Sequence, residues 1–347
     1  MDNMNSDTES SDGEDWKDQL QEERIDSHWL TYNPHAFLPL DDYFYRTGTV
    51  SKINIDIKIP SSEWTPHFVI GCGRSGTTVI SKILSAHPDL CFLNEPRGLW
   101  MQIFPNFDVW SSQAEKRKGR LKMKKPSDQT QAKKINELLF SVTEMLGKTT
   151  LVEKTPENTF RLDWLDALFP NCKFIMVKRN PIQTARSISR FQPDTWFGYN
   201  KYKWSQLLLL LEHFKHVFKL PEEYISHAEE CVFAKALVEW ALCTLSAEEF
   251  KLKMSNEERK IRFYELHLES MIRNPAEETN KLMKFLNLKD SEKVYQLANS
   301  LLHRDLTFSS CIDHLSEYLI NGVSEEALLG MAGSDLRNLI FQHSYHL

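Results

Sequence analysis

An α/β fold of three layers, in which helices cover both faces of a central parallel sheet, is the class that the sequence predicts. From residue 67 onward, short apolar runs alternate with segments of helical periodicity, and this alternation is typical of a parallel sheet. A glycine-rich turn, Gly71–Thr78, joins the first apolar run to the first helical segment. The chain has 347 residues, of which 41% are hydrophobic and 11% aromatic, so it is long and apolar enough to bury a large core.

The elements are predicted in chain order from their apolar spacing. His67–Gly71 is an apolar run that ends in glycine, which indicates a buried strand. The segment 77–86 has apolar residues at helical spacing and ends before Pro88, so we expect a helix there. The same patterns predict strands at 91–93, 150–152, 173–177 and 261–264, and helices at 161–169, 181–189, 202–219, 229–250 and over most of 275–347.

We expect a single domain over residues 27–347, preceded by a disordered acidic tail over residues 1–26. The tail has ten Asp and Glu residues against Lys17 and Arg24, a charge of 2 − 10 = −8, and almost no apolar content. Within the domain, 111–134 is expected to be a basic, solvent-exposed insertion, with nine Lys and Arg residues against two acidic ones. The segment 191–250 is expected to be helical.

Composition excludes several classes of protein. The formal net charge is −6, so the residues after the acidic tail carry −6 + 8 = +2. Six scattered cysteines without a CxxC pair predict reduced thiols and neither a disulfide framework nor a zinc site. No apolar run approaches the roughly 18–20 residues of a membrane span, and the basic residues are not interleaved with aromatic ones as in nucleic-acid-binding proteins. We therefore expect a cytoplasmic protein that binds no nucleic acid, membrane or metal.

The strongest local signal is the loop Gly71-Cys-Gly-Arg-Ser-Gly-Thr-Thr78. Glycines let successive backbone amides point inward, and the N-terminus of the following helix adds partial positive charge, so this P-loop-like turn is suited to an anion. Thr77 stands where a nucleoside-triphosphate loop has lysine, which argues against an ATPase or a nucleotide kinase. Arg74 instead supplies a guanidinium group suited to phosphate or sulfonate. The alternative is a turn that only joins strand to helix.

Four segments together carry a family resemblance: GRSGTT from Gly73, SAHPDLCFLNEPR from Ser85, LVEKTP from Leu151 and FPNCKFIMVKRNPIQTARSISR from Phe169. In this order they resemble the sulfotransferases that use 3′-phosphoadenosine 5′-phosphosulfate (PAPS), in particular the branch that includes the tyrosylprotein sulfotransferases. The resemblance is dense over residues 67–190 and weaker over 261–288.

The resemblance implies a PAPS site. In the family, the loop after the first strand binds the 5′-phosphosulfate, while an arginine at a strand end and a serine eight residues later bind the 3′-phosphate. Arg179 and Ser187 have that spacing. Tyr264 falls where a family aromatic approaches the adenine, although a tyrosine in a strand is equally a core residue. The implied donor-binding residues are Arg74, Ser75, Gly76, Thr77, Thr78, Arg179, Ser187 and Tyr264.

Glu95 is the candidate general base, since a glutamate at the equivalent place in the tyrosylprotein branch takes the proton from the acceptor hydroxyl, with an arginine nearby. Cytosolic sulfotransferases commonly have Lys-x-His with histidine as the base, but this chain has Pro156 at the histidine position. Lys154 remains available to stabilise charge on the transferring group, so Glu95, Lys154 and Arg74 are the implied catalytic residues. Arg97 and Trp100 are expected to contact the acceptor, and the helical segment 191–250 is expected to lie on the acceptor side of the site. The alternatives are an ion pair between Glu95 and Arg97, a surface role for Lys154 and core packing for the tryptophan.

The expected function is therefore a PAPS-dependent sulfotransferase. It moves a sulfuryl group by direct in-line transfer to a hydroxyl (or amine) of a small-molecule or carbohydrate acceptor, without a metal, and releases adenosine 3′,5′-bisphosphate (PAP). A tyrosylprotein sulfotransferase is the alternative and a nucleotide kinase a remote one. A binding module that has lost its chemistry is disfavoured by the presence of Glu95 and Lys154. A homodimer is left open.

Overall fold

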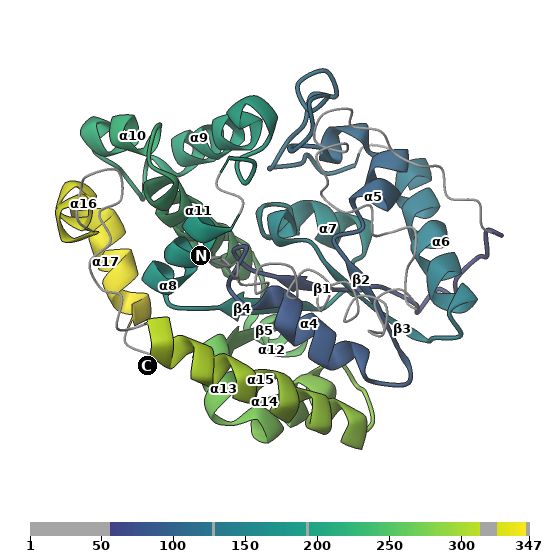
Figure 1. Ribbon diagram of the computed structural model, residues 1–347. Coiled ribbons are helices and arrows are strands. Elements are labelled where there is room, and N and C mark those ends of the chain that lie inside the picture. Colours follow the sequence, from purple (N-terminus) through teal and green to yellow (C-terminus); the bar gives the residue numbers. More distant parts are fainter. Residues whose placement is uncertain (1–55, 127–128, 192–193, 313–324, 345–347) are drawn as a thin grey trace, which may run out of the picture.

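The computed structural model describes residues 56–126, 129–191, 194–312 and 325–344. The predicted acidic tail lies outside these residues. Five parallel strands form one sheet in the order β2-β3-β1-β4-β5 (Figure 1), which confirms the predicted α/β class. The strands are β1 (His67–Ile70), β2 (Leu90–Asn94), β3 (Thr150–Lys154), β4 (Phe174–Lys178) and β5 (Phe263–His267).

Helices cover both faces of the sheet because alternate strand residues face opposite sides. In β1, Phe68 and Ile70 belong to one buried cluster and Val69 to the other. Figure 1 shows the two helical layers above and below the sheet. The first cluster is covered by α5 (Arg97–Ile103), α6 (Gln129–Met145), α7 (Leu162–Leu168), α8 (Pro181–Arg190), α9 (Tyr202–Phe214) and α11 (Val232–Lys253), and the second by α4 (Thr77–Ser85), α13 (Leu268–Arg273), α14 (Pro275–Phe285) and α15 (Glu292–Ile312).

The parallel arrangement brings the carboxyl ends of all five strands to one edge of the sheet. In the register, Val69 of β1 lies opposite Lys154 of β3 and Ile175 of β4, and Asn94 of β2 lies opposite Lys154. The residues that follow these strands therefore share that edge, where open α/β sheets bind their ligands.

The structure departs from the predicted elements in the middle of the chain. The stretch 111–134 is not simply a solvent-exposed insertion: Ala114 and Leu121 are fully buried, and Arg117 forms an ion pair of 2.7 Å with the buried carboxylate of Asp108. The helix α6 begins inside this stretch, and its apolar residues pack into the core. The expectation of exposure was based on charge, and it holds for most of the basic side chains but not for the apolar residues between them, which are buried.

The predicted strand at 261–264 begins later, since residues 256–262 form α12 (Asn256–Arg262) with a capping box between Ser255 and Glu258. The predicted helix at 202–219 ends at Phe214. The remaining elements are the short helices η1 (Pro105–Phe107), η2 (Pro156–Phe160), η3 (Tyr199–Lys201), α10 (Glu222–Ala228), α16 (Glu325–Met331) and α17 (Gly333–Ser344).

Candidate active site

The loop after β1 is fixed by contacts with buried groups. The backbone N–H of Gly71 donates to the hydroxyl of Thr159 in η2 (2.7 Å), and the hydroxyl of Ser75 donates to the carbonyl of Val177 in β4 (3.2 Å). Because these contacts join the loop to the sheet and to η2, the loop holds its backbone amides in one arrangement, as anion binding requires.

Two glycines shape the opening of the loop, where Arg74 and Thr78 are exposed. Gly73 has no space for a side chain, since a Cβ there would lie 2.4 Å from the ring of Trp196. Gly76 precedes α4 with φ 96°, a left-handed conformation that glycine adopts without strain, and no side chain in the described part of the chain caps the first N–H groups of this helix. Thr78 is exposed in its first turn. The positive end of the α4 dipole therefore faces the loop opening.

Three of the predicted donor-site residues meet beside this loop. The Nε of Arg74 donates to Ser187 Oγ (3.2 Å), and the guanidinium lies over the ring of Phe191, with Cζ 4.3 Å from the ring centre. The Nη1 of Arg179 donates to the backbone carbonyl of Arg74 (3.0 Å). Burial and the charge of Arg179 both lower the pKa of Arg74, so the two positive groups repel each other, and a bound anion relieves that repulsion.

Glu95 and Lys154 form an ion pair at the ends of β2 and β3. The Nζ of Lys154 lies 2.5 Å from Glu95 Oε1, and the Nη2 of Arg97 lies 2.8 Å from Glu95 Oε2. Burial alone would raise the pKa of Glu95, but the charges of Lys154 and Arg97 outweigh it and the pKa is lowered. The lowered pKa keeps the carboxylate ionised, and the Glu95 side chain is 22% exposed while that of Lys154 is 1% exposed.

The backbone of Glu95 has φ 50°, in the left-handed region that residues other than glycine rarely adopt. Its N–H donates to the carbonyl of Lys154 (2.6 Å), which holds this conformation. Strain of this kind tends to gather at functional sites, because the surrounding structure must stabilise it. The charge of Glu95 also raises the pKa of Arg74. The Glu95–Lys154 ion pair and the arginines beside the loop therefore interact across the same edge of the sheet.

The other predicted residues have different surroundings. Ser75 and Thr77 are 1% and 2% exposed, so they support the loop from beneath. Trp100 is fully buried, stacks on Phe107 with ring centres 5.3 Å apart, and belongs to the core. Its expected contact with an acceptor is corrected here, because the ring has no exposed surface.

Tyr264 also receives a packing role. It lies within β5, away from the carboxyl end of that strand, and its ring centre is 5.4 Å from that of Phe285. Its hydroxyl donates to Glu278 Oε2 of α14 (3.2 Å), and burial together with the charge of Glu278 raises the pKa of Tyr264 to about 12. Its expected position near the adenine is therefore corrected to one between the sheet and α14.

A buried ionic network behind the site was missed by the sequence reasoning. Glu157, Lys203 and Glu239 are each at most 3% exposed. Lys203 Nζ lies 3.0 Å from Glu157 and 2.8 Å from Glu239. The only signal in the sequence is that Lys203 and Glu239 stand among apolar residues of predicted helices, which does not reveal their partners.

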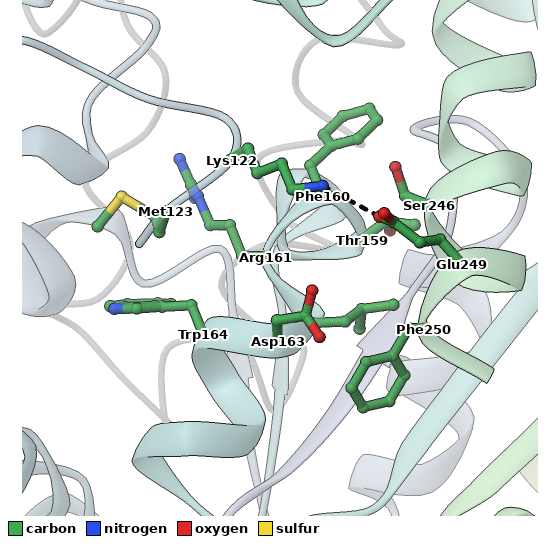
Figure 2. Close-up of a pocket in the computed structure, with 11 residues that line it drawn as sticks. Lys122, Met123, Thr159, Phe160, Arg161, Asp163, Trp164, Ser246, Glu249 and Phe250 are labelled. Atoms are coloured by element: carbon green, nitrogen blue, oxygen red, sulfur yellow. Dashed lines mark hydrogen bonds and ion pairs between the residues drawn. The ribbon is translucent and has the colours of Figure 1, made fainter. Parts of the chain in front are cut away.

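A small cavity lies next to Thr159, the residue that accepts the Gly71 N–H, and is lined by residues of η2 and α11. Its volume is about 20 Å³, which is room for about one water molecule. Figure 2 shows Lys122 and Glu249 joined at its rim, where their charged atoms are 3.0 Å apart, with Thr159 and Arg161 on the wall. This cavity is too small to hold a nucleotide or an acceptor.

Within the described ranges, no three His, Cys, Asp or Glu residues gather closely enough to hold a metal ion. The helices of the same residues include none that is both long and apolar enough to cross a membrane.

Comparisons with known proteins agree with the resemblance. The sequence profile described as the sulfotransferase family matches residues 66–292. The chain is similar to protein-tyrosine sulfotransferase 1 of Homo sapiens, with 30% identity over 166 residues, which are 45% of this chain and 44% of that protein. It is also similar to nodulation protein NoeE of Sinorhizobium fredii, with 27% identity over 147 residues, covering 37% of this chain and 31% of that protein. The matched segment thus spans less than half the length of these relatives.

Among solved structures, the fold is similar to that of the sulfotransferase domain from the curacin biosynthetic pathway. The two chains have 18% identity and a TM-score of 0.41, and the match covers 67% of this chain and 78% of that one.

Proposed function

Because the chain belongs to the sulfotransferase family, we propose that it transfers a sulfuryl group from PAPS to an acceptor hydroxyl (or amine). The observation that carries this proposal is that two sets of polar and charged side chains lie at one edge of the sheet. Arg74, Arg179 and Ser187 gather beside the glycine-rich loop, and the Lys154–Glu95 pair follows the neighbouring strands.

The residues present fit a phosphosulfate donor. The loop amides, the amino terminus of α4 and the Arg74–Arg179 pair supply positive potential for its anionic groups. Bound there, the donor would supply an electrophilic sulfur and a phosphate leaving group. Ser187 adds a hydroxyl beside Arg74, so we propose that Arg74, Arg179 and Ser187 hold donor phosphates together with the loop.

Glu95 is the proposed general base. Its lowered pKa keeps it ionised at neutral pH, and its exposed edge can accept the acceptor proton as the oxygen attacks sulfur. Lys154 is proposed to stabilise the negative charge on the transferring group, since its ammonium is buried and already lies at the same edge of the sheet. A negatively charged donor would compete with Glu95 for this ammonium, which would raise the pKa of Glu95 and make it a stronger base.

The first acceptor class that we propose is a small molecule or carbohydrate. Arg97 is 7% exposed and forms ion pairs with Glu95 and Glu157, so its charge is already matched and is not offered to an acidic peptide. The second class is a protein tyrosine, supported by the similarity to protein-tyrosine sulfotransferase 1.

Incubation with sulfur-labelled PAPS and an acceptor panel tests the proposal. The panel contains phenols, aliphatic alcohols, amino sugars and tyrosine peptides with acidic flanks, and the class that becomes labelled identifies the acceptor. Glu95→Gln should lower the transfer rate by roughly 10²–10⁴-fold, whereas Glu278→Gln on α14, outside the site, should not. Equal rates for wild type and Glu95→Gln would show that another group is the base.

Binding of PAP tests the donor site separately. At 100 times its dissociation constant, a ligand that binds only the folded state stabilises it by about 2.7 kcal/mol, which a thermal shift detects. If PAP and PAPS leave the midpoint unchanged, the donor assignment is wrong.

A further inference from the structure

Six charged side chains, two in the proposed site and four behind it, form one continuous ionic network of alternating sign. The network runs from Lys154 to Glu95, Arg97, Glu157, Lys203 and Glu239, with the charged atoms of each neighbouring pair within 3.6 Å. Three of these groups are cations and three are carboxylates, so the network is neutral as a whole. Since the groups from Arg97 onward are buried, each depends on its neighbours for charge compensation.

The Arg97 end of this network sets the position of the proposed base. Arg97 has few alternative positions, because its guanidinium lies over the ring of Trp110, with Cζ 4.0 Å from the ring centre. It is shared between Glu95 at 2.8 Å and Glu157 at 3.6 Å. Glu157 in turn accepts from the Trp110 indole N–H (3.0 Å) and pairs with Lys203.

The other end reaches the glycine-rich loop. Glu239 Oε2 accepts from the indole N–H of Trp196 (2.8 Å), while its Oε1 lies 2.8 Å from Lys203 Nζ. The Trp196 ring lies directly against Gly73, where an added Cβ would be 2.4 Å away. The tryptophan is thereby held between the carboxylate and the loop backbone.

We propose that Lys203 is a positioning residue that fixes both halves of the site, orienting Arg97 against Glu95 through Glu157 and orienting Trp196 against Gly73 through Glu239. It lies on α9, outside the strand ends, and touches neither the proposed base nor the loop. The proposal rests on the proposed function for the meaning of the two halves, but the contacts themselves do not depend on it.

Loss of the lysine charge has a defined consequence at each end. Without Lys203, Arg97 is the cation in contact with Glu157, supported by the charge of Arg161 and by the Trp110 N–H, so Arg97 is drawn toward Glu157 and away from Glu95. The charged groups that act on Glu95 are Lys154, Arg97, Glu157 and Arg74, and weaker contact with Arg97 raises the pKa of Glu95. At the other end, Glu239 loses its counter-ion and its hold on Trp196 changes, which loosens the support of the loop.

The test uses two measurements on the full chain that need no acceptor. One is a titration of carbon-13-labelled glutamate side chains by NMR, with the Glu95 signal assigned from its absence in Glu95→Gln. The other is the affinity for PAP by calorimetry. Lys203→Met should raise the pKa of Glu95 by about one unit and weaken PAP binding about tenfold, and Lys203→Arg should restore both toward wild type.

Lys235→Met is the matched control. Lys235 is also a lysine buried in the helical layer, at 4% exposure, but it donates to the carbonyl of Glu229 and lies over the rings of Phe197 and Trp204. Its loss should destabilise the fold without changing the Glu95 titration or PAP affinity. A folded Lys203→Met protein with wild-type values for both would overturn the proposal.

Two milder variants keep the proposal testable if Lys203→Met does not fold. Glu157→Gln removes a negative charge that raises the pKa of Glu95, so it should lower that pKa, opposite to Lys203→Met. Trp196→Phe keeps a ring beside Gly73 but loses the N–H to Glu239, so it should weaken PAP binding and leave the Glu95 titration unchanged. Failure of either variant to change its own readout would contradict the proposal, whereas a wild type that binds no PAP would contradict the proposed function instead.

Discussion

At the scale of single residues, Arg74 shows how side-chain shape adds to charge. Its guanidinium both stacks on Phe191 and donates from Nε to Ser187, which a lysine ammonium cannot reproduce. Arg74→Lys should therefore weaken PAP binding about tenfold, since a stacking contact and a hydrogen bond are lost while the charge is kept. Calorimetric titration measures the change, with the exposed Arg337→Lys on α17 as control. Equal affinities for wild type and Arg74→Lys would mean that only its charge is used.

Glu153 is a second residue with a defined electrostatic state. Burial raises its pKa from 4.5 to about 7, against hydrogen bonds from Thr155, Trp100 and Asn158 and the charge of Lys154, which lower it. The folded protein thus keeps a proton that the unfolded chain releases above pH 4.5. Stability is therefore highest below pH 4.5 as far as this group is concerned, and it falls as pH rises toward 7, by an amount on the order of 3 kcal/mol.

Urea unfolding of wild type and Glu153→Gln at a series of pH values measures this dependence. The amide stays neutral, and rotation of Asn158, whose Oδ1 has no hydrogen-bond partner among the described residues, can present an acceptor to it. We expect the variant to lose the fall in unfolding free energy between pH 4.5 and 7. The same slope in both proteins would show that Glu153 is ionised in the folded state.

At the scale of elements, η2 supports the loop from outside the sheet. Thr159 accepts the Gly71 N–H and donates to the carbonyl of Pro156, both at 2.7 Å and fully buried. Thr159→Val keeps the shape but leaves the buried Gly71 N–H without this partner, which costs about 1–3 kcal/mol, while the Pro156 carbonyl keeps its backbone bond within η2. Urea unfolding should show this loss. Thr184→Val is the matched control, since that buried threonine only donates to a carbonyl of its own helix, Asn180, and its loss should cost less than that at Thr159.

The elements that the sequence predicts well are those with a local cause. The strand–loop–helix unit at 67–85 was predicted within one or two residues, because an apolar run, glycines and helical spacing are all local signals. The meeting of Arg74, Arg179 and Ser187 followed from the family resemblance, and the parallel sheet brings them together.

The missed features depend on distant partners. The burial of Leu121 within a basic stretch, the pairing of Lys203 with Glu157 and Glu239, and the core position of Trp100 each involve residues far apart in the chain. Periodicity shows which face of a helix is apolar, but it does not show which charged residue lies opposite another in the folded protein. A lysine in an apolar helix is a signal that a partner exists, and only the fold identifies that partner.

At the scale of the whole molecule, the sheet separates two cores of different composition. Every tryptophan of the described ranges belongs to the core on the α11 face or packs against it, namely Trp64, Trp100, Trp110, Trp164, Trp196, Trp204 and Trp240. The core on the α14 face has none among its described residues. Both cores are built on the same strands, since Val69 and Ile70 of β1 face opposite sides. We therefore propose that they form one cooperative domain.

A substitution on the tryptophan-free face tests this cooperativity. Leu282 of α14 is fully buried there, and Leu282→Ala should cost about 2–5 kcal/mol. In a background with Trp16 and Trp29, which lie outside the described residues, replaced by phenylalanine, tryptophan fluorescence reports only the opposite core. If the sheet couples the two cores, Leu282→Ala lowers the urea midpoint by fluorescence as much as by circular dichroism, whereas the exposed Leu252→Ala leaves both nearly unchanged. A shift seen by circular dichroism alone would show that the α14 face unfolds separately, and the chain would then have two folding units on one sheet.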